Sequence, residues 1–121
     1  MTNDAQSYGM LVETVTSEMK QMGQTQPELI SAFSKLAAAG TGDGALSRKT
    51  RELIALGIAI AVRCDDCIGF HIKALLRLGV TQEEIEEAAG TAVYMGGGPS
   101  MMYAMHALVA YKEFRPAAQP S

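Results

Sequence analysis

The sequence contains no tryptophan, only two cysteines and four prolines, and aromatic residues make up just 6% of its 121 positions. Lysine and arginine together number 10 against 13 aspartates and glutamates, so the formal net charge is −3. Proteins that bind nucleic acids present basic surfaces to the phosphates and, on single strands, aromatic side chains to the bases. The shortage of both predicts that nucleic acid is not a partner.

Long hydrophobic runs are missing as well. The longest strongly apolar stretch, residues 53–62, has ten residues, about half of what a membrane-spanning helix needs. The N-terminal sequence MTNDAQSYGM lacks the basic stretch and apolar block of a secretory signal. Two cysteines are too few for the disulfide framework of a small secreted domain. These features predict a cytoplasmic protein with reduced thiols and no membrane partner.

Hydrophobic residues make up 48% of the chain, enough for the core of one domain spanning residues 1–121. Apolar residues recur at helical spacing between glycines and prolines, and no segment alternates as a strand would. The pattern predicts a small all-α bundle of about six helices. Their expected ranges are 10–22 (ended by Gly23), 27–39 (ended by Gly40), 48–62, 64–78, 81–95 and 99–114. Residues 1–8 are expected to be frayed and 115–121 to form a flexible tail.

Local signals mark several of these boundaries. Ser47 is a suitable N-cap, Thr81 and Glu84 match a capping box, and Gly79 suits a helix end. The helix 48–62 is apolar on nearly all sides after its first turn, so we expect it to be central. The last helix is rich in Met and Tyr on more than one face, which favours a homo-oligomer. The alternative is a last helix that runs through the middle of a monomeric core.

The two cysteines belong to one motif, Cys64-Asp65-Asp66-Cys67, and His71 follows it. On a helix, residues three and four positions apart share a face. The two thiols can therefore meet as a disulfide, and Cys67 can meet the His71 imidazole. A helix N-terminus stabilises a thiolate. Because the two aspartates repel that thiolate, deprotonation calls for a base, and His71 is the nearest candidate.

Other interpretations of these residues stay open at this point. The cysteines could be buried thiols that only pack. A zinc site would use Cys64, Cys67 and His71, with His106 as an optional fourth ligand, but a second closely spaced ligand pair is absent. Glu52, the one acidic residue of its helix, could be a buried general base. Its composition and spacing alone favour an exposed carboxylate in the first turn.

The stretch from Glu52 to His71 has a distinctive pattern: Glu, eleven residues, Cys-x-x-Cys, three residues, His. It resembles the alkyl hydroperoxidase D-like branch of the carboxymuconolactone decarboxylase family, over roughly residues 45–112. The resemblance implies a trimer or hexamer of all-α chains and a thiol peroxidase or disulfide reductase without metal or other cofactor. It also implies that Cys67 attacks a peroxide, Cys64 resolves the product, Glu52 and His71 relay protons, and a lipoyl-type dithiol donates electrons.

One position departs from the best-known form of this pattern, because Asp66 stands where a histidine precedes the second cysteine. A carboxylate there adds a repelling charge beside the thiol. Two further functions remain as alternatives. One is a lactone decarboxylase of the same family, although that branch generally lacks the cysteine pair. The other is a non-enzymatic oligomeric helical protein whose cysteines sense oxidation or only pack.

Overall fold

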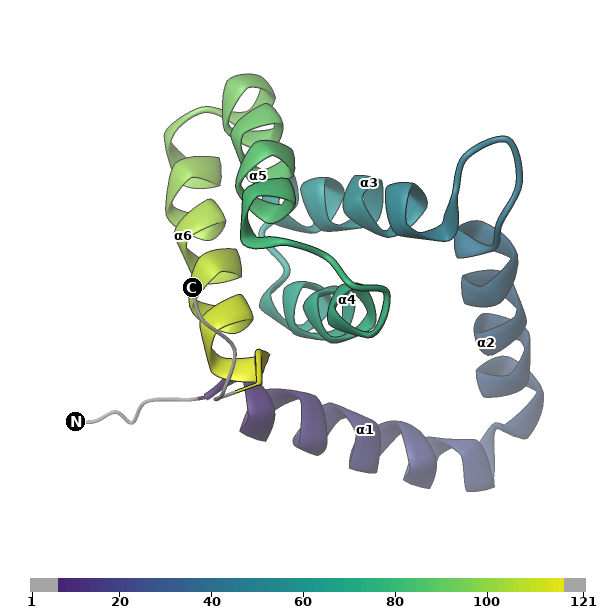
Figure 1. Cartoon of the computed structure of the whole chain (residues 1–121). Coiled ribbons are helices and arrows are strands. Elements are labelled where there is room, and N and C mark those ends of the chain that lie inside the picture. Colours follow the sequence, from purple (N-terminus) through teal and green to yellow (C-terminus); the bar gives the residue numbers. More distant parts are fainter. Residues whose placement is uncertain (1–6, 117–121) are drawn as a thin grey trace.

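The computed structural model of the protein describes residues 7–116, which form six α-helices and no strand (Figure 1). The helices are α1 (Tyr8–Thr25), α2 (Pro27–Thr41), α3 (Arg48–Ala61), α4 (Asp65–Arg77), α5 (Gln82–Gly96) and α6 (Gly98–Phe114). The all-α class and the six helices predicted from the sequence are thus confirmed. Between residues 7 and 116, no helix is both long and apolar enough to cross a membrane.

Hydrogen bonds at the helix ends explain most of the boundaries. The Ser47 side chain accepts from the Thr50 N–H at 3.1 Å, and Thr81 and Glu84 form the predicted capping box. Gly79 ends α4 with a φ of 78°, a backbone conformation that favours glycine. These three signals are local, and the structure confirms each of them.

Two glycines that were expected to end helices do not do so. Helix α1 continues past Gly23 to Thr25, and α2 continues through Gly40 to Thr41. A glycine inside a helix costs only about 1 kcal/mol relative to alanine, so its presence alone does not end a helix. The end of α1 is set by Pro27, because proline disfavours the helical conformation in the residue before it. Accordingly, Gln26 has a φ of −135° and serves as the N-cap of α2.

Both ends of the chain lie partly outside the described residues. Of the start that was expected to be frayed, residues 1–6 are not described, but Tyr8 begins α1 and is only 8% exposed. Glu113 on α6 accepts hydrogen bonds from the Tyr8 and Gly9 backbone N–H groups, each at 2.9 Å. Of the expected tail, α6 ends at Phe114 as predicted, and residues 117–121 are not described.

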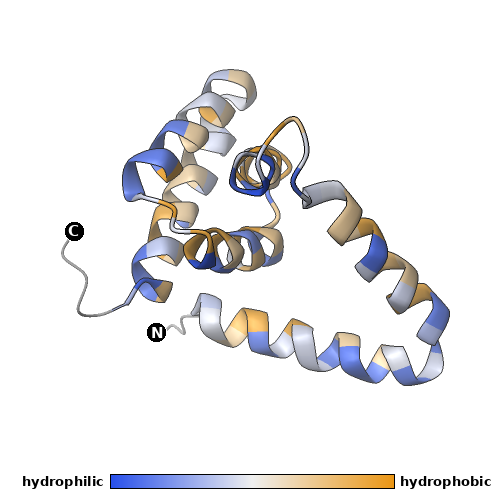
Figure 2. Ribbon diagram, turned by 45° about the vertical axis from the view of Figure 1, so that its right-hand side comes forward, coloured by the Kyte–Doolittle hydropathy of each residue, from blue (hydrophilic) through white to orange (hydrophobic). Residues whose placement is uncertain are grey.

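Helices α1, α2 and α3 form three sides of a frame around α4, and α5 and α6 close the fourth side (Figure 1). Helix α2 stands apart, contacts only α1 and α3 within the described chain, and has no buried residue. Hydrophobic residues recur along the ribbons of α3 to α6, and α2 also carries them (Figure 2). The core therefore belongs to α3–α6 and the start of α1. Its fully buried large side chains include Leu56, Ile60, Ile68, Ile72, Leu75 and Ile85.

Helix α3 is central on one face only. It packs on α2, α4, α5 and α6, with Leu56 and Ile60 fully buried. Its other face leaves Ile54 and Ile58 49% and 58% exposed in the single chain. Helix α6 is divided in the same way, since its buried face consists mainly of alanines. Its exposed hydrophobic side chains are Met101, Met102, Met105 and Val109.

Gly69 lets α1 and α4 approach closely. A Cβ at this position would lie 2.9 Å from Val12 Cγ2 and 3.3 Å from Tyr8 Cδ1, closer than carbon atoms pack. Gly69 therefore fixes how near the start of α1 can come to the start of α4.

We expect Gly69→Ala to lower the free energy of unfolding by about 1–3 kcal/mol, because the added methyl group overpacks this contact. Gly90→Ala is the matched control, since Gly90 also lies inside a helix but has no atom near its would-be Cβ. That control should gain up to about 1 kcal/mol from helix propensity. Urea denaturation measures both values. Equal stability of the two variants would show that the contact of α1 with Gly69 has room for a methyl group.

Candidate active site

The turn between α3 and α4 positions the cysteine motif. Arg63 has a φ of 61°, the only positive φ of a non-glycine residue between residues 7 and 116. Its N–H bonds to the Ile60 carbonyl at 3.1 Å, and the Cys64 N–H bonds to the Ala59 carbonyl at 3.0 Å. This is a Schellman motif, and the same motif ends α4 at Gly79. A strained residue therefore stands directly before the first cysteine.

Cys64 is the N-cap of α4, and Cys67 lies in the first turn of that helix. The Cys67 N–H donates a hydrogen bond to Cys64 Sγ at 3.2 Å, and a disulfide bond joins the two residues. Both residues are half-buried. The sulfurs thus meet at the positive end of the helix dipole, which favours a thiolate when the bond is reduced.

Glu52 lies on α3 and is only 4% exposed. Its Oε1 and the Nδ1 of His71 on α4 form a hydrogen bond of 2.6 Å. The prediction from composition and spacing, that Glu52 is an exposed carboxylate, is therefore wrong. Because Glu52 holds Nδ1 of the imidazole, Nε2 is left for another partner. His71 lies one helical turn after Cys67, so the pair lies beside the cysteines along α4.

A second polar cluster, not expected from the sequence, surrounds Asp65 in the first turn of α4. Asp65 Oδ1 accepts a hydrogen bond from the Tyr8 hydroxyl at 2.5 Å and lies 2.9 Å from His106 Nδ1. Burial, and then the hydrogen bond to Asp65, raise the pKa of the Tyr8 phenol far above its usual value. The ring of Tyr103 packs against His106 with centroids 4.6 Å apart. We call Tyr8, Asp65 and His106 the Asp65 cluster.

Sequence reasoning missed this cluster because nothing in the spacing links its members. Asp65 was considered only as a charge that repels a thiolate, and His106 only as a possible zinc ligand. The one available signal is that His106 is the second of only two histidines in the chain. In the structure the four residues considered for zinc divide among three contacts: the disulfide, His71 with Glu52, and His106 with Asp65.

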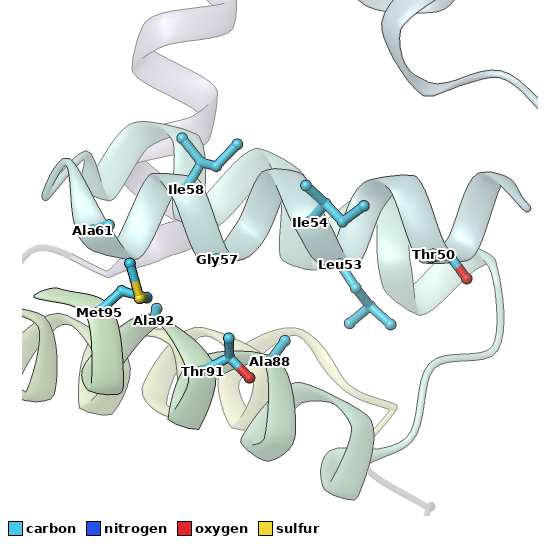
Figure 3. Close-up of a pocket in the computed structure, with 10 residues that line it drawn as sticks. All are labelled: Thr50, Leu53, Ile54, Gly57, Ile58, Ala61, Ala88, Thr91, Ala92 and Met95. Carbon is cyan, nitrogen blue, oxygen red and sulfur yellow. The ribbon is translucent and has the colours of Figure 1, made fainter. Parts of the chain in front are cut away.

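An apolar groove of about 410 Å³ lies between α3 and α5 (Figure 3). The residues that line it are Thr50, Leu53, Ile54, Gly57, Ile58, Ala61, Ala88, Thr91, Ala92 and Met95. The α3 residues among them lie on the face opposite Glu52, as helical periodicity requires. The groove is therefore separate from the cysteines and from the Glu52–His71 pair.

Two bonded cysteines at the start of a helix, beside a buried carboxylate and a histidine, define an all-α protein with a paired-cysteine site. The model of the carboxymuconolactone decarboxylase family matches residues 27–110, and the chain belongs to this family. This confirms the family indicated by the pattern from Glu52 to His71.

The relatives agree with this assignment. An uncharacterized protein from Cupriavidus necator is 40% identical over 94 residues, covering 78% of this chain and 83% of the relative. A family member from Legionella pneumophila has a crystal structure with a TM-score of 0.88 and 48% identity, covering 90% of this chain and 97% of that one. A Thermotoga maritima family member has a TM-score of 0.75 and 28% identity, over 84% and 87% of the two chains. A role in the antioxidative response has been suggested for that protein.

The Schellman turn before Cys64 generates a prediction about stability. Arg63→Gly should raise the free energy of unfolding by about 1 kcal/mol, because glycine has no Cβ to strain a positive φ. Gly79→Ala, in the matching turn after α4, should lower it by a similar amount. Urea denaturation of both variants measures the difference. A loss of stability in Arg63→Gly would mean that the arginine side chain stabilises the turn by more than the strain costs.

Proposed function

We propose that the protein is a thiol-dependent oxidoreductase that cycles Cys64 and Cys67 between dithiol and disulfide while it reduces a peroxide or a small disulfide. The observation that carries the proposal is the meeting of the two sulfurs at the start of α4, one turn before a histidine held by a buried carboxylate. The antioxidative role suggested for the Thermotoga maritima relative agrees with it. A lactone decarboxylase would have no need of a disulfide-forming pair.

In the proposed peroxidase reaction, the Cys67 thiolate attacks one oxygen of the peroxide. The O–O bond breaks, the departing alkoxide takes a proton from His71 and leaves as an alcohol, and Cys67 becomes a sulfenic acid. The Cys64 thiol then attacks the Cys67 sulfur, which forms the disulfide and releases water. A dithiol donor of the lipoyl type returns two electrons and two protons and is itself oxidised to a disulfide.

The choice of Cys67 as the attacking thiol is supported by its position. Cys67 and His71 are four residues apart on one helix and share a face. Cys64 is seven residues from His71, about 10 Å along the helix axis. Glu52 holds the imidazole through Nδ1, which leaves Nε2 of the His71 ring to accept the Cys67 proton and later release it.

The function is tested by counting free thiols. After reduction and removal of the reductant, one equivalent of an organic hydroperoxide should consume both thiols of each chain and yield one alcohol. Added dihydrolipoamide should make the reaction catalytic. If no thiol is lost, the oxidoreductase is excluded, and assays with a lactone acid then separate decarboxylation from a protein without enzymatic activity.

The two cysteines should behave differently when each is replaced. In Cys64→Ser the peroxide should produce a sulfenic acid on Cys67 that dimedone traps, because the resolving thiol is gone. In Cys67→Ser the remaining thiol should react at least tenfold more slowly, because it lacks the adjacent base. Mass spectrometry locates the label. Rapid labelling of Cys64 in Cys67→Ser would reverse the proposed roles.

Loss of either member of the Glu52–His71 pair should slow the thiol chemistry. We expect Glu52→Gln and His71→Ala each to reduce the peroxidase rate by about a hundredfold, because the proton of the reacting thiol loses its acceptor. Glu87→Gln, an exposed carboxylate on α5, is the control and should keep the wild-type rate. Stopped-flow kinetics as a function of pH measures the effect. An unchanged rate and pH profile in Glu52→Gln would exclude the relay.

We also propose that the protein assembles with further copies of itself, as a trimer or a hexamer. Sixteen large hydrophobic side chains of the described residues are at least 39% exposed, far more than isolated surface positions explain. A stable interface takes about 800 Å² from each partner around an apolar centre. The groove between α3 and α5, whose lining includes Ile54 and Ile58, offers such a centre to a second copy (Figure 3).

Light scattering at micromolar concentration should therefore give three or six times 12.9 kDa. Ile58→Asp should weaken the association at least tenfold, because burial of such a side chain is worth about 1.5–3 kcal/mol. Gln21→Asp, which places the same charge at an exposed polar position of α1, should leave the mass unchanged. A wild-type monomer would exclude the assembly.

A further inference from the structure

Both histidines of this chain are held in the same way. His71 Nδ1 lies 2.6 Å from Glu52, and His106 Nδ1 lies 2.9 Å from Asp65. The first pair lies one turn after Cys67. The second includes the residue that directly follows Cys64. One histidine–carboxylate pair therefore follows the cysteine motif and a second includes a residue of the motif, and the proposed reaction uses only the first of them.

The Asp65 cluster joins three helices at one carboxylate oxygen. Tyr8 comes from α1, Asp65 from α4 and His106 from α6. Tyr8 is itself fixed, because it is 8% exposed and its backbone N–H is bonded to Glu113 on α6. Gly69 on α4 provides the space for the Tyr8 ring. An arrangement built from so many separate contacts holds the Asp65 carboxylate in one position.

Among the ion pairs of residues 7–116, Asp65 has one partner, His106. Asp66 adds a second carboxylate on the same helix, and the neighbouring groups from α1 and α6 include Tyr8, Tyr103 and Glu113, which carry no positive charge. Within residues 7–116, no lysine or arginine nitrogen lies within 4.0 Å of Asp65. His106, whose Nδ1 lies 2.9 Å from Asp65 Oδ1, is thus the group that would balance the carboxylate next to Cys64 whenever its imidazole carries a proton.

On the basis of the proposed dithiol function, we propose that His106 and Tyr8 are positioning residues for Cys64. Together they fix Asp65, and His106 offsets its charge, so that the Cys64 thiol can ionise when the disulfide forms or is reduced. In this arrangement each cysteine has its own histidine–carboxylate pair. Glu52 and His71 exchange the proton of the Cys67 thiol, whereas Asp65 and His106 influence the Cys64 thiol through their charge.

The test measures the reactivity of each thiol alone, using iodoacetamide. In the Cys67→Ser protein only Cys64 remains, and there His106→Gln should slow alkylation at pH 7 about three- to tenfold. The midpoint of the pH–rate profile should move upward by about half to one pH unit, the size expected for a unit charge nearby in a partly exposed site. In the Cys64→Ser protein the same substitution should change Cys67 alkylation less than twofold.

Further variants separate charge from structure. Glutamine keeps a hydrogen-bond donor without a charge, whereas His106→Lys should restore a rate within twofold of wild type. When Asp65→Asn is already present, His106→Gln should have less than a twofold effect, because there is no carboxylate to balance. Tyr8→Phe should slow Cys64 about twofold, and Tyr111→Phe, an equally buried tyrosine, should have no effect.

Alkylation needs neither a peroxide nor an electron donor, so the test is independent of turnover. Absence of peroxide reduction together with these His106 effects would reject the proposed function and keep the charge assignment. Normal turnover with an unchanged Cys64 rate in His106→Gln would overturn the inference alone. Equal slowing of both thiols, or failure of His106→Lys to restore the rate, would also overturn it.

Discussion

A carboxylate buried in an apolar environment must be hydrogen-bonded, and the bond between Glu52 and His71 meets this requirement. Glu52 lies on α3 and His71 on α4, and only residues 62–64 separate the two helices. The bond therefore fixes the crossing of two neighbouring helices as well as the orientation of the imidazole. Since the turn between them carries Arg63 and Cys64, the same constraint determines where the dithiol lies relative to the histidine. The packing of α3 on α4 and the orientation of the His71 imidazole thus depend on the same hydrogen bond.

The N-terminal segment carries no motif, yet it contributes to the site through packing. Gly69 lets α1 approach α4, and this approach brings the Tyr8 hydroxyl to Asp65. The first N–H groups of a helix have no partner within the helix. At the start of α1, Tyr8 and Gly9 donate these N–H groups to the Glu113 carboxylate on α6. The first turn of α4 is thus supported from α1 and α6 as well as from α3. Such support keeps a short helix start, which would otherwise fray, in a single arrangement.

The sequence was sufficient where the determining contacts are local. Ser47 and Thr81 bond to backbone groups three residues away, so their roles follow from spacing alone. The motif from Glu52 to His71 was found as a pattern, but the burial of Glu52 was not, because burial depends on how α3 packs on other helices. The bonds of Asp65 connect positions 8, 65 and 106, and no periodicity relates such distant residues. The ends of α1 and α2 were misplaced because a glycine by itself opposes a helix only weakly.

The start of α4 combines two electrostatic demands that conflict. Acidic side chains in the first turn stabilise a helix, and Asp65 and Asp66 do so here. The same charges oppose a thiolate on Cys64 or Cys67, which is the form that the proposed reaction requires. A change within the helix start cannot satisfy both demands, since removal of the aspartates would weaken the helix. Two histidines near these groups are positioned from farther along the fold: His71 is held by α3, and His106 lies on α6. A cysteine site of this kind depends on tertiary packing to set its charge, even though its cysteines are neighbours in the sequence.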